Sequence, residues 1–278
     1  MPVISTNNAA NASLNYLNNN SNKETNLLSQ LASGSRIVQA SDDAAGLAIG
    51  TQLQANVTVY NQDATNVSQG TAILQSADGA LAQISNVLQR MMALATEAAS
   101  GQVTNSQRSE DINTEYTQLK SEISSIVSST TYAGQTLLSG SFLSNVKFLV
   151  GTLSSNFITI SVASVSVGGT NGLLGNTGST VSTAATALQA INKINSAINT
   201  ITKDRAKIGA YESQFSFSSQ DIATNSQNIT AAASVVLDAD VASVKSQLSS
   251  VDVKTQASVA ALTQAAQLPS ELLRLIQS

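Results

Sequence analysis

The sequence predicts a mainly α-helical protein: a long helical bundle or coiled-coil rod that carries one small β-hairpin element. Three observations support this fold class. Apolar residues recur at alternating spacings of three and four through most of the 278 residues, which is the period of a helix that buries one face. Glycine, serine and aspartate interrupt these runs at only a few points. One window, at about residues 140–170, is instead rich in alternating β-branched residues.

The first predicted helix has a weak apolar stripe and ends within LASGSRIVQASDDAAGLAIG, residues 31–50. Gly34 suits the C-cap of this helix because glycine tolerates a left-handed backbone. Ser41, Asp42 and Asp43 supply N-cap chemistry for the next helix, where carboxylates also favour the positive end of the dipole. Arg36 lies between the two caps. The stripe consists of Leu14, Leu17, Leu28 and Leu31.

The second and third predicted helices have the strongest stripes. A helix over residues 68–99 would be roughly 48 Å long. Gly101 separates it from the third helix, which Asn105 or Ser106 begins and the TYAG turn at 131–134 closes. The second stripe is Leu74, Ala77, Leu81, Ile84, Leu88, Met91, Ala95 and Ala98. The third stripe is Ile112, Tyr116, Leu119, Ile123 and Ile126.

Alternation then predicts two strands, VKFLVG at 146–151 and NFITISVASVSVGG at 156–169, followed by a glycine-rich loop at 168–180. Helix resumes near Ser182, continues with interruptions to about residue 265, and ends by Pro269. The terminal helices are amphipathic and have little nearby in sequence to cover them. They must therefore pair with each other or with other chains.

Composition excludes several classes of function. The chain has no Cys and no His, so thiolate chemistry and the commonest general base and metal ligand are missing. A net charge of −4 with sparse basic residues gives no nucleic-acid surface. Paired carboxylates are better explained as helix starts or solvated faces than as catalytic groups. We therefore expect no enzyme, no cofactor and no metal. The carboxylate pairs are Asp42–Asp43, Glu110–Asp111 and Asp238/Asp240.

The sequence also predicts no membrane insertion, because no run of about 18 apolar residues occurs. The N-terminus, MPVISTNNAANASLNY, lacks the basic and apolar regions of a secretory signal peptide. If the protein is exported, we expect a route that leaves no cleaved signal peptide.

Several stretches together resemble bacterial flagellins. LASGSRIVQASDDAAGLAIG resembles the family's N-terminal signature, and TTYAGQTLLSG (130–140) resembles its aromatic-x-Gly turn. KFLVG followed by FITISV is similar to the family's β-hairpin. RAKIGAYESQF (205–215), LDADVAS and QAAQLPSELLRLIQS resemble the C-terminal core and the family's C-terminus. The resemblance covers both ends and the core of the chain, so it is specific.

The resemblance implies a short flagellin: a structural subunit that self-assembles through its terminal helices into the extracellular flagellar filament, for bacterial motility. It implies an inner terminal-helix domain of residues 1–44 and 236–278, in which the two terminal helices pair. An outer-core helical rod would span 45–235, with the β-hairpin at about 140–170. Larger relatives insert outer domains near residues 165–185. Here that space holds only a glycine-rich loop, so the large outer domains are absent.

Partners follow from the same resemblance. A homo-polymer would contact the hook-associated junction and cap proteins, the flagellar export apparatus and an export chaperone of the C-terminal helix. The Toll-like flagellin receptor would bind the second and third helices, where Arg90 and Leu94 lie one turn apart and Glu115 lies on the neighbouring helix. The competing interpretation makes Met91 a core residue and Arg90 a solvated one.

Assembly would use the segment that joins the first two predicted helices (residues 34–43, the spoke) and the apolar stripes of the terminal helices. Arg36 is predicted to contact an acidic group of a neighbouring subunit. Some family positions differ here: Val244 stands where the family frequently has a Glu, so a charge pair with that Glu cannot form. The candidate subunit-interface and spoke residues are Arg36, Asp42, Asp43, Leu28, Leu31, Val241, Val244, Leu248, Val251 and Leu262.

Three alternatives stay open at this point. A filament-junction protein shares the terminal helices. An enzyme carried on a filament scaffold would need an inserted catalytic segment, and no such motif occurs. A secreted needle-tip or adhesin module is the third. Electron microscopy after seeding with filament fragments separates them, because only a filament subunit extends the seeds.

Overall fold

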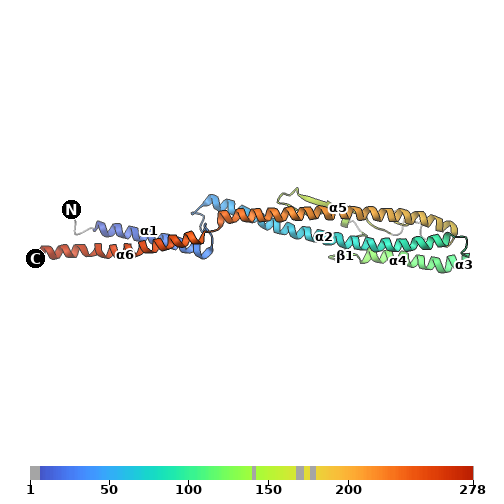
Figure 1. The fold of residues 1–278 in the computed structure, drawn as a ribbon, viewed down its shortest axis with the longest axis horizontal. Coiled ribbons are helices and arrows are strands. Elements are labelled where there is room, and N and C mark those ends of the chain that lie inside the picture. Colours follow the sequence, from blue (N-terminus) through green and yellow to red (C-terminus); the bar gives the residue numbers. More distant parts are fainter. Residues whose placement is uncertain (1–6, 140–141, 167–171, 176–179, 278) are drawn as a thin grey trace. The chain divides into compact units, whose positions relative to one another are not determined.

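Long helices make up most of the described chain (Figure 1): α1 (Asn8–Ser33), α2 (Ala44–Ala99), α5 (Ala184–Leu237) and α6 (Val241–Gln277). The structure is a computed structural model that describes residues 7–139, 142–166, 172–175 and 180–277. It forms two compact units. The terminal unit comprises Met1–Val57 and Gln227–Ser278, and the central unit comprises Thr58–Ser226. The mainly helical fold class predicted from the sequence is confirmed.

In the terminal unit, α1 and α6 lie side by side and antiparallel (Figure 1). Polar contacts fix their register: Asn20 Nδ2 donates to Ser258 Oγ at 3.2 Å, and Thr255 Oγ1 donates to Glu24 Oε2 at 3.4 Å. The less exposed positions repeat every three or four residues on both helices, as expected for a paired seam. They include Ala10, Ser13, Leu17, Asn20, Glu24, Leu27 and Leu31 on α1, and Val244, Leu248, Val251, Thr255, Ser258, Leu262 and Ala265 on α6.

The end of α1 follows the prediction. Gly34 adopts a left-handed φ of 69°, and its N–H donates to Gln30 O at 2.9 Å. A residue with a Cβ would be strained in this conformation, so glycine is the natural C-cap.

The prediction that helix ends by Pro269 is wrong, because the backbone of α6 stays helical to Gln277. Proline has no N–H, so it leaves the carbonyl four residues earlier, that of Ala265, without its helical donor. Asn7 Nδ2 donates to this carbonyl at 2.6 Å, while Asn7 Oδ1 accepts from Ala10 N and caps α1. A side chain from the opposite end of the chain thus replaces the missing bond.

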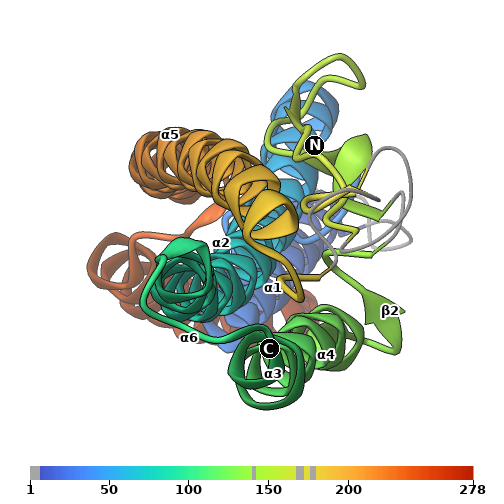
Figure 2. The same cartoon turned by 90° about the vertical axis from the view of Figure 1, so that its right-hand side faces the viewer.

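In the central unit, α2, α4 (Asn113–Ser129) and α5 lie side by side (Figure 2). All eight apolar positions predicted for the second helix are completely buried, from Leu74 to Ala98. Tyr116 and Ile123 of α4 and Phe215 of α5 complete the core with them. The heptad prediction is therefore confirmed here residue by residue.

A tight corner joins α2 to α4 through α3 (Asn105–Gln107) and a π-helical segment (Arg108–Ile112). The cap of α3 is Thr104, in a capping box with Gln107, rather than the predicted Asn105 or Ser106. Arg108 is buried without a carboxylate. Its guanidinium donates to the carbonyls of Ala98, Ser100 and Val103 and to the side chain of Asn105. It satisfies carbonyls left free where α2 ends.

Two short antiparallel strand pairs occur in the described residues. β1 (Thr131–Tyr132) pairs with β2 (Gln135–Thr136) around Ala133 and Gly134, both at positive φ. The sequence had indicated only a helix-closing turn there. β3 (Val146–Leu149) pairs with β4 (Phe157–Ile160), in register Val146 with Ile160. The β3–β4 hairpin was predicted, but both of its strands are shorter than expected. The end of the predicted second strand and most of the glycine-rich loop lie outside the described residues.

The β3–β4 hairpin packs against the long helices of its own unit. Phe148 meets Phe215 edge to face, with ring centroids 5.5 Å apart. Asn66 Nδ2 donates to Leu149 O at 3.3 Å, and Ser161 N donates to the hydroxyl of Tyr211 at 3.2 Å. The hairpin therefore extends the central core over one side of α2 and α5.

Candidate functional site

The spoke segment (residues 34–43) joins α1 to α2 and pairs with the chain where α5 passes into α6. Arg36 N donates to Leu237 O at 2.7 Å, and Ala239 N donates to Gly34 O at 2.9 Å. Ser35 and Asp238 form an antiparallel bridge between these two bonds. The α1–α2 connection is thus hydrogen-bonded to the α5–α6 connection, although about 200 residues of chain separate them.

Arg36 reinforces this pairing from its side chain. Nε and Nη2 donate to Val236 O at 3.1 and 2.9 Å, and Nη2 lies 3.5 Å from Asp43 Oδ2. Cations near the last carbonyls of a helix also complement its dipole. The side chain remains 53% exposed, so contact with a neighbouring subunit, as expected from the sequence, stays a prediction beside these contacts within the chain.

The two aspartates of the spoke have different roles. Asp43 Oδ1 accepts from Gly46 N at 2.8 Å and caps α2, as predicted. Asp42 Oδ2 instead accepts from Val38 N and Gln39 N at 3.1 and 2.9 Å. The prediction that Asp42 also caps the helix is wrong, because its carboxylate closes the loop that precedes the helix.

Close packing follows the spoke into α2. A Cβ on Gly50 would lie 2.4 Å from Cδ2 of Leu237, so α2 and α5 approach each other through a glycine in the terminal unit. Sequence reasoning did not single out Gly50. A lone glycine inside a helical pattern was the available signal, since such a position usually has a packing reason.

The predicted interface residues of the terminal helices fall into two groups. Val244 and Val251 are buried, and Leu31, Leu248 and Leu262 are half-buried, all within one chain. Leu28 and Val241 are 47% and 53% exposed. Other exposed apolar residues of this unit were not among the candidates. They are Leu14, Tyr16, Val38, Ile49, Val235, Val253 and Val259.

The predicted receptor residues lie on α2 and α4. Arg90 and Glu115 are exposed and form an ion pair at 2.7 Å. Leu94 is only 3% exposed and belongs to the core, as does Met91. The folded chain therefore presents two of the three candidate side chains at its surface.

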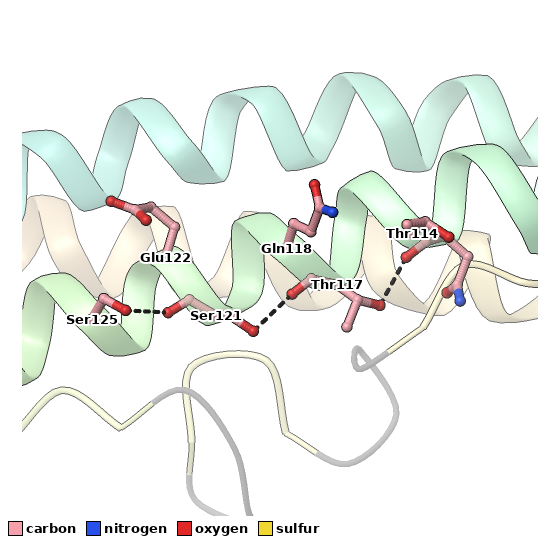
Figure 3. Close-up of a pocket in the computed structure, with 7 residues that line it drawn as sticks. Thr114, Thr117, Gln118, Ser121, Glu122 and Ser125 are labelled. Carbon is pink, nitrogen blue, oxygen red and sulfur yellow. Dashed lines mark hydrogen bonds between the residues drawn. The ribbon is translucent and has the colours of Figure 1, made fainter.

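An open hollow of about 430 Å³ on α4 offers no reactive constellation (Figure 3). Its hydroxyls donate to the backbone of their own helix, Thr117 to Asn113 O and Ser121 to Thr117 O, at 2.7 and 3.1 Å. Serine and threonine bonded in this way are satisfied on a solvated face. Of the described residues that line the hollow, Glu122 alone is ionisable.

Two carboxylates are buried among the described residues of the central unit, and no sequence pattern predicted either of them. Asp63 and Asp204 each have one oxygen without a hydrogen-bond partner among the described residues. Burial raises the pKa of Asp63 above its ordinary value of 3.8. Asp204 retains a bond from Lys207 Nζ at 3.1 Å. Asp63 lies on α2 and Asp204 on α5, and no described group of three acidic, His or Cys side chains includes them as metal ligands.

Within the described residues, no group of three or more acidic, His or Cys side chains is arranged to hold a metal ion. None of the helices described here has the length and apolar character needed to cross a membrane.

Comparison with known proteins gives a consistent result. The family model of the bacterial flagellin N-terminal helical region matches residues 4–142, and that of the C-terminal helical region matches residues 191–276. The flagellin of Listeria monocytogenes serovar 1/2a is 30% identical, over 95% of both chains. A flagellar filament 30.7 kDa core protein of Treponema maltophilum is also 30% identical, over 86% of this chain and 87% of its own.

A flagellin of Bacillus subtilis strain 168 is 28% identical over 99% of both chains. A crystal structure of Bacillus cereus flagellin is similar at 28% identity and a TM-score of 0.48, over 61% of this chain and 94% of that chain. The two family models cover both helical ends, and the relatives extend over almost the whole length. Proteins of this kind are structural and not enzymes. The chain belongs to the bacterial flagellin family and is a self-assembling structural subunit of the extracellular flagellar filament.

Proposed function

We propose that the two units divide the work of the filament subunit. The terminal helices, residues 1–44 and 236–278, form the inner part and carry most of the contacts between copies. Residues 45–235 form the outer-core part. The observation that supports this division is the incomplete burial of α1, which has no buried residue although it carries an amphipathic stripe.

A two-helix pair covers only one side of each helix. In the terminal unit the opposite sides still expose apolar side chains such as Leu28, Val241 and Val253. Exposed apolar surface of this kind marks sites that bind other protein surface. A neighbouring copy offers the same helices, and repeated contacts that do not close on themselves generate a helical filament.

Seeded growth tests this division with matched variants. Leu28→Asp and Val241→Asp place a charge on exposed positions of the terminal unit and should abolish extension of filament fragments. Leu188→Asp does the same at an exposed position of α5 in the central unit and should extend them. Circular dichroism checks that all three chains fold. Normal growth of both terminal variants would refute the proposed division.

The finer partners come from the same family expectation. We assign the junction and cap proteins and the export apparatus to this subunit, together with a chaperone that holds the C-terminal helix before assembly. The regular stripe of α6 supports the last assignment, because an unpaired α6 presents Val244, Val251 and Ala265 on one face. Copurification from cells with and without Val251→Asp would test it, and undiminished capture would oppose it.

Receptor binding is a separate proposal. It is supported by the exposed Arg90–Glu115 pair, whereas Leu94 is available only if the core opens. Signalling by the wild-type protein should fall with Arg90→Ala. Equal, negligible signals from both proteins would end the idea.

A further inference from the structure

A groove of about 420 Å³ runs along one flank of the α1–α6 pair. Its floor is apolar, formed by Leu27 of α1 and Val251 of α6. Lys23 and Lys254 line it from the two helices. The remaining lining residues are uncharged: Asn26, Gln30, Gln247 and Ser250.

Neither lysine has a carboxylate partner among the described ion pairs. Two ammonium groups at one groove repel each other. An acidic group that entered the groove would relieve this repulsion and gain two attractive contacts. The groove therefore selects for a partner that presents a carboxylate beside apolar side chains.

The opposite flank of the same helix pair presents such a surface. Asp252 lies two residues before Lys254, about 200° around the helix. On α1, Leu28 lies about 140° from Lys23, so it too is turned away from the groove. Leu28 and Val259 are exposed apolar residues, and both belong to the flank that carries Asp252.

Among the described residues, Asp252 has no ion-pair partner, and its carboxylate accepts one side-chain bond, from Gln256 Nε2 on its own helix, at 3.3 Å. The other described carboxylates of the terminal unit accept from backbone N–H groups, from a hydroxyl or from Arg36. These are Glu24, Asp42, Asp43, Asp238 and Asp240.

We propose that Asp252 of one copy binds between Lys23 and Lys254 of a neighbouring copy in the filament, with Leu28 and Val259 covering the apolar groove floor. The inference rests on the proposed role of the terminal helices in assembly. Because the two complementary surfaces lie on opposite flanks, the contact is heterologous and adds copies without closing. A complementary charge pair would also fix the lateral register between copies.

A charge swap tests the pair directly in the full-length chain. Lys254→Asp and Asp252→Lys should each raise the lowest concentration that supports seeded growth by about tenfold, equivalent to the loss of one good ion pair. The triple variant, Asp252→Lys with Lys23→Asp and Lys254→Asp, should recover growth to within about threefold of wild type, because both attractive contacts are restored with their signs exchanged. Lys203→Asp, a charge change of the same kind at an exposed position of α5 in the central unit, is the control and should grow normally.

The outcomes separate the two proposals. A wild-type chain that fails to extend seeds would overturn the role in assembly itself. Wild-type growth together with a triple variant as impaired as the single ones would overturn the Asp252 contact alone. Normal seeded growth of both single variants, with reduced secretion from cells, would assign the groove to an export partner and also overturn it.

A second measurement does not depend on the strength of the contact. The chain has no cysteine, so Asp252→Cys and Lys254→Cys introduce unique thiols. Filaments grown from a mixture of the two should yield cross-linked dimers with a short bis-maleimide, while filaments of either one alone should not. Mixed filaments without dimers would contradict the proposal.

Discussion

α1 and α2 both carry apolar residues at heptad spacing, yet the two helices are buried to very different extents. The stripe of α2 is completely buried from Leu74 to Ala98, whereas α1 has no buried residue. The difference lies in the number of neighbours. In the central unit, α4, α5 and a hairpin surround α2, while α1 has one partner helix in the chain. The same sequence pattern thus forms a fully buried core in the central unit and a partly exposed helix pair in the terminal unit.

The largest expected effect comes from the same substitution in the two units. Leu81→Ala removes a completely buried side chain and should lower the free energy of unfolding of the central unit by about 2–5 kcal/mol. Leu28→Ala, at a 47% exposed position, should cost the unpolymerised chain less than about 1 kcal/mol. Segment-resolved hydrogen exchange and thermal unfolding measure both. Similar losses of unfolding free energy for the two variants would show that Leu28 is packed within the single chain as tightly as Leu81.

Glycine positions sharpen the comparison. Gly50→Ala forces a Cβ into Leu237 and should destabilise the terminal unit by about 1–3 kcal/mol. Gly79→Ala in the central unit meets open space and should stabilise α2 by about 0.5–1 kcal/mol. Chemical denaturation monitored by circular dichroism reports both changes. A neutral Gly50→Ala would mean that α2 and α5 can separate there at little cost.

In the central unit, the buried carboxylate of Asp63 lowers the stability of the folded chain. Burial raises the pKa of Asp63 in the folded chain above the value of 3.8, so the folded state holds this proton more tightly than the unfolded state. The penalty is present above the folded pKa and disappears as pH falls through it. Asp63→Asn should therefore stabilise the unit by about 1 kcal/mol at pH 7, with a smaller gain near pH 4. Denaturation at both pH values checks this, and a gain independent of pH would exclude the charge as its cause.

The smallest expected effect concerns the spoke. Arg36→Ala should cost the isolated chain less than about 1 kcal/mol, because the ion pair with Asp43 is long and exposed. The filament should nevertheless weaken or change its twist, because Arg36 holds the spoke to the carbonyl of Val236. Filament reconstruction of the variant would reveal this. Unchanged filaments would show that Arg36 acts only through its contacts within one chain.

The sequence allowed the core of the central unit to be predicted almost residue by residue, because heptad spacing depends only on local periodicity. It also located Gly34 and Asp43, whose capping roles are local. The β1–β2 pair was missed because two-residue strands are too short for alternation to be visible. The hydrogen bond from Arg36 to Val236 O could not be predicted, because the two residues are 200 positions apart in the sequence and meet only in the folded chain.

Two further errors have the same origin. Pro269 reads locally as a helix end, but Asn7 supplies the bond that the proline lacks. The resemblance places Leu94 on a receptor-binding surface, but its side chain is buried in the core of the central unit. In both cases a contact distant in sequence decides the outcome, and no local pattern reports such a contact.

The bond from Asn7 to Ala265 makes the last helix depend on the first residues of the chain. A copy trimmed by a protease before α1 would lose the donor that compensates for Pro269, and its C-terminal helix would carry an unsatisfied carbonyl. Damage at one terminus would therefore weaken the opposite one. If filament growth requires a well-formed α1–α6 pair, copies that have lost Asn7 would be incorporated less readily than intact ones.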